Sequence, residues 1–457
     1  MADGAASFPK GDHGGEGRIS TLHEDLLYEI IRRLLVTAAV RTTGLASRWR
    51  HLWRSIPLVL FDSDLPEAGR AAIVARILAE HPGPFRTICL IDSSFASLDL
   101  ELADWPRLLD AKGTQELILY NKPTGTSSRL PAGIFRCASL ERLSLAYWTF
   151  PDDLPRVAGA FPNLQLLGMM CIFISDQDVE CLLAASPVLQ TLAFHGITKR
   201  VHISNQNLRC VIAGLCSMME EFAVVEAPLL EWFVFLEAPR GEADRVTVKI
   251  VCAPNLRVLG YLEPRIHRLQ IGDNTITPDT RASPSTLVPG VKILAMKVNF
   301  GDLWEVKMLA SFLRCFPNVD TLHIQVSSRV HYPSVLHDQS VTAHEHLLKF
   351  WQEASPVECL RSHIKRMVID KFRGDQNEFE FLKFMATNAQ ELQSLLVVSP
   401  DENFALADKV NEMINKLGCR RFRPWTARGL LGSPTPWNTL IFEKVKVSDL
   451  TVDDPFY

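Results

Sequence analysis

Histidine and acidic residues cluster at one point of the chain in a pattern that could bind a metal ion. His344, Glu345 and His346 are consecutive, and His337 precedes them closely. Imidazole and carboxylate groups are zinc ligands, but side chains at positions i and i+2 point apart on a helix. We therefore interpret this cluster as the polar start of a helix and predict no metal site.

The motifs of common enzyme classes are absent from the sequence. It contains no G-x-x-x-x-G-K-[ST], no G-x-S-x-G and no H-E-x-x-H, and no strand-like segment precedes the glycines of residues 14–17. The 10 cysteines form no C-x-x-C pair and mostly occupy apolar strings, where a free thiol behaves as a small hydrophobe. We therefore predict a protein without catalytic residues or a cofactor, in a reducing compartment.

Composition and charge indicate an ordinary globular chain of two or three structural units. Hydrophobic residues make up 47% of the 457 residues, charged residues 22%, and the net charge is −4. No run approaches the roughly 18 apolar residues of a membrane helix, and residues 1–17 are Gly-rich and polar, unlike a secretory signal. We predict a disordered tail at 1–17 and an intracellular protein, in the cytoplasm or nucleus, with no membrane or nucleic-acid partner.

The residues that could recognise a partner lie in a helical segment, residues 18–57. Leu26, Ile30 and Leu34 recur at helical spacing, which predicts an amphipathic helix over 23–34, with a capping box that starts at Thr21. Two shorter helices are predicted over 37–43 and 47–54. Because so short a segment is too small to bury all its apolar residues alone, we expect it to need a partner surface.

This helical segment is also basic. Residues 18–54 contain seven arginines and three acids, a charge of 7 − 3 = +4, so the rest of the chain carries −8. Such a segment could contact phosphates or an acidic protein. Binding to duplex DNA would depend steeply on salt, and we expect none.

From residue 58 onward a short apolar phrase recurs. A turn, then often Pro-Asn, precedes a string with leucines at alternate positions. The anchor leucines are 24, 25, 19, 21 and 27 residues apart, namely Leu140, Leu164, Leu189, Leu208, Leu229 and Leu256. A period of about 20–29 residues is typical of leucine-rich repeats, in which each repeat supplies one strand and a return segment. Residues 275–289 and 327–341 interrupt the array and are predicted to be loops.

The last hundred residues follow another pattern. The sequence predicts a strand over 363–369, a helix over 378–388, a strand over 392–398, a helix over 403–416 and a final strand over 437–447. We therefore expect an α/β chain with a short three-helix unit at 18–57, an irregular repeat solenoid at 58–350 and an α/β cap at 351–457.

At three places the sequence resembles a known family. The residues are Arg18-Ile19-Ser20, Leu22, Asp25-Leu26-Leu27 and Ile30, then Ala39-Val40-Arg41-Thr42, then Arg48-Trp49-Arg50 with Leu52-Trp53. Together they resemble the F-box of plant F-box/leucine-rich-repeat proteins. The string from Cys359 through Phe372, Gly374 and Phe381-Leu382 to Leu392 resembles the FBD domain that ends many of them.

The resemblance implies a substrate receptor of SCF-type cullin–RING ubiquitin ligases. In such proteins the F-box docks on a Skp-family adaptor, and through it on a cullin, while the repeats hold a target protein. The adaptor-binding residues would then be Leu22, His23, Leu26, Leu27, Ile30, Leu34, Val40, Leu45 and Trp49. An alternative is an interaction scaffold that has lost adaptor binding.

Four positions depart from the family pattern. His23 and Leu35 stand where Pro is usual, Ala38 where an acid is common, and Gly44 where a bulky apolar residue is usual. A glycine inside a helix costs roughly 1 kcal/mol relative to alanine. We expect these changes to affect the strength of adaptor binding rather than its existence. The identity of the target protein cannot be inferred from the sequence.

Overall fold

The structure is a computed structural model of the chain. It describes residues 22–45, 49–93, 95, 99–121, 128–151, 161–214, 218–235, 245–278, 280–327, 340–353, 357–399, 412 and 450–456. The chain divides into two compact units, Met1–Glu141 and Arg142–Tyr457. The predicted boundaries at 57 and 350 do not coincide with this division. The predicted tail at 1–17, the loop at 327–341 (apart from Ser327 and from Ser340 and Val341, which begin a helix), the helix at 403–416 (apart from Glu412) and the strand at 437–447 lie outside the described residues.

The first unit begins with three short helices. They are α1 (Glu24–Arg32), α2 (Val36–Arg41), which continues into a 3-10 turn at Thr42–Gly44, and α3 (Trp49–Leu52). The N-cap of α1 is His23, whose Nδ1 accepts a hydrogen bond from the amide of Asp25 at 3.5 Å. The predicted capping box is therefore wrong in its first residue, because the imidazole at position 23 takes the capping role. Acidic residues in the first turn and Arg32 in the last complement the helix dipole.

A parallel sheet of three strands follows in the same unit. Strand β1 (Leu58–Phe61) pairs with β2 (Phe85–Leu90), which pairs with β3 (Glu116–Tyr120), and helices α4 (Arg70–Glu80) and α5 (Asp99–Ala111) connect them. A 3-10 turn, Ala132–Arg136, comes later. Leu35 forms a parallel bridge with Val59, so the helices are joined to the first strand by backbone hydrogen bonding as well as by packing.

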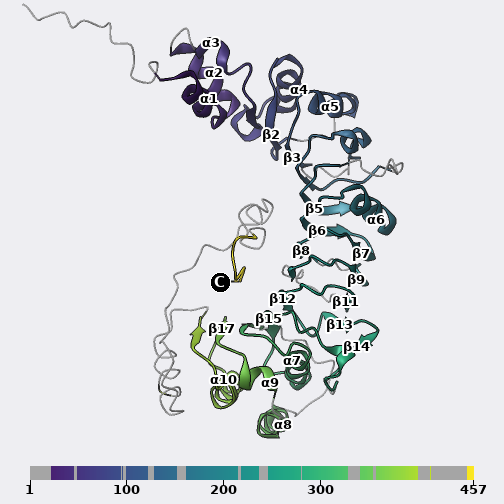
Figure 1. The fold of residues 1–457 in the computed structure, drawn as a ribbon, viewed down its shortest axis with the longest axis vertical. Helices are drawn as coiled ribbons and strands as arrows, with labels where there is room; N and C mark the ends of the chain where they lie inside the picture. Colours follow the sequence, from purple (N-terminus) through teal and green to yellow (C-terminus); the bar gives the residue numbers. More distant parts are fainter. Residues whose placement is uncertain are drawn as a thin grey trace, which may run out of the picture. The chain divides into compact units, whose positions relative to one another are not determined.

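The second unit contains a longer run of parallel strands. Its main sheet has the order β4-β5-β6-β8-β10-β12-β15-β16-β17-β18 (Figure 1). The bounds are β4 (Arg142–Ala146), β5 (Leu166–Phe173), β6 (Thr191–Ile197), β8 (Cys210–Ala213), β10 (Trp232–Phe235), β12 (Val258–Leu262), β15 (Ile293–Val298), β16 (Thr321–Val326), β17 (Arg366–Asp370) and β18 (Ser394–Val397).

The return segments of this unit are of two kinds. Helices α6 (Asp176–Ala185), α7 (Leu303–Cys315), α8 (Ser340–Glu353), α9 (Glu358–Ser362) and α10 (Gln376–Asn388) lie toward its two ends in sequence. Between them, strands replace helices and form a second sheet: β7 (Arg200–Ser204), β9 (Glu221–Glu226), β11 (Val246–Ile250), β13 (His267–Ile271) and the antiparallel β14 (Asn274–Thr275). The predicted loop at 275–289 contains one 3-10 turn, Pro284–Thr286.

The core of the second unit is a ladder of apolar side chains in register across the main sheet. It consists of Leu167, Leu192, Val211, Phe233, Leu259, Leu294, Leu322, Met367 and Leu395. All nine are buried. Because neighbouring side chains on a strand point to opposite faces, this ladder forms one face of the sheet and the residues between its members form the other.

Asparagines that precede the repeat strands have a structural role. The side-chain amides of Asn207, Asn255 and Asn318 each donate a hydrogen bond to the carbonyl of a proline one repeat earlier, at 2.7–3.0 Å. Five of the predicted anchor leucines are fully buried, but Leu229 is 43% exposed and its neighbour Leu230 is buried. The anchor of that repeat is therefore Leu230, because its string contains two consecutive leucines and spacing alone does not choose between them.

The cysteines largely behave as predicted. Among the described residues eight are free, and Cys89, Cys137, Cys210, Cys315 and Cys359 are buried. Burial raises the pKa of the Cys210 thiol to about 12, and the nearby Glu231 adds to the shift. No helix in the described residues has the length and hydropathy to cross a membrane. The described residues also hold no cluster of three potential metal ligands.

Candidate protein-interaction surface

The three N-terminal helices have a filled interior of their own. Leu27 and Ile31 of α1, Ala39 of α2 and Trp49 of α3 are all at most 1% exposed. These side chains come from all three helices, so their burial holds the helices together. Leu27 and Trp49 were expected to contact a partner. That expectation is wrong for both, because no surface of either side chain remains for an external protein.

An adjacent face of the same helices is apolar and exposed. Leu26 is 52% exposed and Ile30 37%, and these two side chains share one face of α1 because they are four residues apart. Val40 is 41% exposed near the end of α2, and Leu45 is 61% exposed after the following turn. We call these four residues the exposed apolar set. It holds four of the ten large hydrophobic residues exposed in the described part of the chain, within only 20 positions.

The remaining predicted residues border this set. Leu22 and Leu34 are half-buried, and His23 is exposed at the N-cap of α1. The structure therefore places seven of the nine predicted residues wholly or partly at the surface of the helices. A one-residue offset along α1 separates the exposed Leu26 and Ile30 from the buried Leu27 and Ile31.

Charged groups around α1 are solvated. Arg32 pairs with Glu29 at 3.2 Å, and His23 lies 3.1 Å from Asp25, with all four side chains at least half exposed. Such exposed pairs contribute little to stability, but their charges act on the approach of a charged partner. The arrangement offers apolar contact area within a polar border, as protein interfaces do.

A hollow of about 710 Å³ adjoins the exposed apolar set. Its walls come from α2, from the two residues after α3, and from α4 with the loop that follows it. The lining residues are Val36, Thr37, Val40, Arg41, Trp53, Arg54, Ile77, Glu80, His81 and Pro82. Trp53 stacks on His81, with 5.3 Å between ring centroids, and the Arg54 guanidinium lies 5.6 Å from the Trp53 ring centroid. Sequence reasoning missed the contribution of residues 77–82, because no local pattern shows that this loop returns to the helices.

His81 is kept uncharged in this environment. Burial, and then the positive charge of Lys112, lower its pKa from 6.5 to about 4. Neither ring nitrogen has a hydrogen-bond partner among the described residues. The wall formed by Trp53 and His81 is therefore aromatic and neutral near pH 7, which suits contact with an apolar side chain.

Comparison with known proteins identifies two domains of the chain. Residues 102–324 match the family model described as the LRR repeats of FBD-associated F-box protein At5g56370, and residues 352–397 match the FBD model. The chain therefore has leucine-rich-repeat and FBD domains within its mixed α/β fold. Neither match includes the N-terminal helices.

Several Arabidopsis thaliana proteins are similar over most of the chain. F-box/FBD/LRR-repeat protein At1g13570 is 24% identical over 414 residues, which cover 86% of this chain and 93% of the relative. F-box/FBD/LRR-repeat protein At4g00160 is 24% identical, with 87% and 90% covered. Putative FBD-associated F-box protein At5g56700 is 26% identical, with 85% and 99% covered. The resemblance to plant F-box/leucine-rich-repeat/FBD proteins is confirmed.

Proposed function

We propose that this protein is a non-catalytic substrate receptor of an SCF-type cullin–RING ubiquitin ligase, located in the cytoplasm or nucleus. Its N-terminal helices, residues 18–57, are an F-box that docks on a Skp-family adaptor, and its repeats hold a target protein. The names of the similar Arabidopsis proteins support the F-box assignment. Under this proposal the protein binds and presents its target, and other subunits transfer ubiquitin.

The observation that carries the proposal is the exposed apolar set. Leu26, Ile30, Val40 and Leu45 remain in water although the helices already have a complete interior. Covering the exposed part of four such side chains contributes roughly 1 kcal/mol each to an association. A surface of this kind on an otherwise ordinary unit marks a site for another protein.

The departures from the family pattern do not prevent the helices from forming. His23 caps α1, and Leu35 bridges to Val59. Gly44 occupies a 3-10 turn rather than an α-helix, and a Cβ added there would meet nothing within 4 Å. These features support adaptor binding over the alternative of a scaffold that has lost it.

Co-purification with a Skp-family adaptor tests the proposal. The full chain is expected to retain the adaptor, whereas Leu26→Asp combined with Ile30→Asp is expected to weaken binding by about 100-fold or more, since two carboxylates would be placed in an apolar contact. Val225→Asp combined with Val251→Asp is the matched control, because both valines are exposed in the second unit. Failure of the unmodified chain to retain the adaptor would favour the scaffold alternative.

A further inference from the structure

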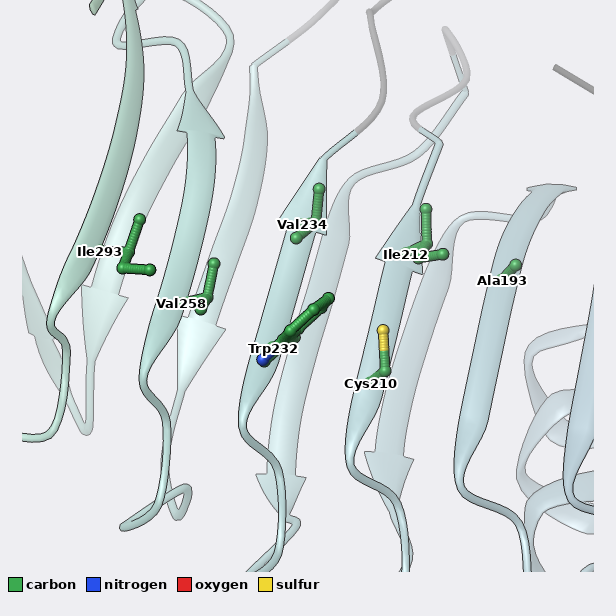
Figure 2. Packing of buried hydrophobic residues seen from close by; sticks show 7 residues of the cluster. All are labelled: Ala193, Cys210, Ile212, Trp232, Val234, Val258 and Ile293. Atoms are coloured by element: carbon green, nitrogen blue, oxygen red, sulfur yellow. The ribbon is translucent and has the colours of Figure 1, made fainter. Parts of the chain in front are cut away.

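One face of the main sheet of the second unit is unusually apolar. It lies opposite the leucine ladder, and its side chains form two rows in register across neighbouring strands. Cys210, Trp232, Val258 and Ile293 make one row, and Ala193, Ile212 and Val234 make the other. Figure 2 shows these seven residues, which we call the apolar face. All are at most 5% exposed, although no leucine ladder covers this side.

The C-terminal residues of the chain pack on this face. Leu450, Val452 and Phe456 lie against the seven residues, and Figure 1 shows their segment in yellow facing the strands of the main sheet. The segment contacts the face at these three positions although it runs through turns at 450–451 and 455–456 and a bend at 453. A contiguous apolar patch of this size is typical of a binding surface, and here the chain supplies its own occupant.

A buried ion pair fixes the position of the segment. Asp454 Oδ2 lies 2.9 Å from His323 Nε2 and 3.5 Å from Arg366 Nη1. Only 2% of the His323 side chain and 10% of the Asp454 side chain are exposed. His323 lies on β16 and Arg366 on β17, beyond the apolar face, so the hydrophobic and polar contacts follow one another along the sheet.

The same environment sets the ionisation of Asp454. Burial alone would raise its pKa. The hydrogen bond and charge of His323, the hydrogen bond from the amide of Phe456 at 3.1 Å and the charge of Arg366 together lower it below the usual value. The carboxylate of Asp454 is therefore charged near neutral pH.

Two aromatic rings contact Phe456, which lies two residues after Asp454. The ring of Phe456 lies 4.9 Å from Tyr261 and 5.5 Å from His323, measured between centroids. The register between β12 and β15 shifts between Leu259 and Leu262, at the position of Tyr261. Gly260 adopts φ +135° there, and a Cβ on it would lie 2.1 Å from the carbonyl oxygen of Ala295, so no other residue fits. The local shape of β12 therefore sets the position of Tyr261.

We propose that this surface is a binding site for a short segment with the order apolar-x-apolar-x-acid-x-aromatic, and that residues 450–456 occupy it until a segment of the target protein with that order displaces them. The identification of the displacing segment with a target rests on the proposed function. The binding chemistry does not rest on the proposed function, because residues 450–456 of the chain itself make these contacts. Asp453, which lies 3.5 Å from Arg257 and is 91% exposed, is an accessory contact.

Binding of the tail as a separate peptide tests the inference. A fluorescently labelled peptide with the sequence of residues 450–457 is titrated against the full chain and against a tail-released full chain carrying Asp454→Lys and Phe456→Ala. The tail-released chain is expected to bind the peptide at least about tenfold more tightly, because a tethered occupant competes at high effective concentration. Peptides carrying Asp454→Asn or Phe456→Ala are the matched controls and should bind at least about tenfold more weakly.

Equal binding of the peptide to both chains, or no binding to the tail-released chain, would overturn the inference. If the double variant does not unfold cooperatively, Asp454→Asn alone replaces it in the full chain. Arg366→Ala in the tail-released chain should also weaken binding of the peptide. Since no adaptor is present in this titration, its failure is distinguishable from a failure of the receptor proposal.

Discussion

Adjacent residues of α1 differ in exposure, and this contrast separates the interior of the helices from their candidate binding surface. Leu27 and Ile31 are fully buried, while Leu26 and Ile30 face solvent. The sequence pattern shows an apolar stripe broader than one interface needs. It does not show where the stripe divides between the interior of the unit and its surface. That is why Leu27 was predicted as a contact and is instead part of the core.

Stability measurements should separate these two roles. Leu27→Ala is expected to lower the free energy of unfolding by about 2–5 kcal/mol, since it leaves a cavity in a filled interior. Leu26→Ala should change it by less than about 1 kcal/mol, because the side chain is already half in water. Chemical denaturation of the full chain, followed by hydrogen exchange of the backbone amides of α1 and α2, measures both. Similar losses for the two variants would contradict the burial pattern.

Glu305 in α7 gives the second unit a pH-dependent stability. Burial raises its pKa from 4.5 to about 7, against the opposing effect of the hydrogen bond from the Asn299 amide at 2.8 Å. The folded state therefore holds a proton that the unfolded state releases between these values. Its contribution to stability is complete below about pH 4.5 and decreases as the pH rises to about 7, by on the order of 3 kcal/mol.

Glu305→Gln should remove this dependence, because glutamine keeps an acceptor for the Asn299 amide and does not ionise. Unfolding free energies of the unmodified chain, relative to those of the variant, are expected to fall between pH 5 and pH 8. Denaturation at several pH values measures the difference. Parallel pH profiles would show that the carboxyl group ionises in the folded protein as it does in the unfolded one.

At the scale of elements, the sequence predicted the strands of the repeats well and their return segments poorly. Alternating leucines mark a strand with one buried face, and each predicted repeat strand has a counterpart in the main sheet. The short segments between these strands contain alternation as well, for example Val246 and Val248 in β11, but no repeat spacing distinguishes a returning strand from a loop. The segment forms a strand because it pairs with β9 and β13 in the second sheet.

The anchor of one repeat offers a direct check on this packing. Leu230→Ala is expected to destabilise the second unit by about 2–5 kcal/mol, whereas Leu229→Ala, at a side chain 43% exposed, should cost less than about 1 kcal/mol. Thermal or chemical unfolding of the two variants measures this. A larger loss at Leu229 would restore the register predicted from spacing alone.

The sequence predicted which residues of the N-terminal helices reach the surface, but it did not predict the whole surface. Leu22, His23, Leu26, Ile30, Leu34, Val40 and Leu45 follow from helical spacing and from the family resemblance, and all reach the surface at least in part. The wall formed by Trp53 and His81 joins residues 28 positions apart through tertiary packing. The covering of the apolar face by residues 450–456 joins segments about 200 positions apart, and a seven-residue string ending in Asp-Pro-Phe carries no sign of this.

At the scale of the whole molecule, the two compact units support two separate binding activities. The first unit carries the exposed apolar set, and the second carries the apolar face with its resident segment. The charge does not follow this division, because residues 18–54 carry +4 whereas the whole first unit, Met1–Glu141, has 16 basic and 17 acidic residues, a net charge of 16 − 17 = −1. Under the receptor proposal, the basic segment 18–54 favours rapid encounter with an acidic adaptor, while the exposed apolar set determines how long the complex lasts.

Calorimetric titration of the full chain with a purified Skp-family adaptor tests the central claim most directly. The receptor account predicts a one-to-one complex whose affinity falls by about 100-fold or more when Leu26→Asp and Ile30→Asp are introduced together, and stays unchanged with Val225→Asp and Val251→Asp. Absence of binding by the unmodified chain, or equal affinity of the Leu26 and Ile30 double variant, would contradict the account.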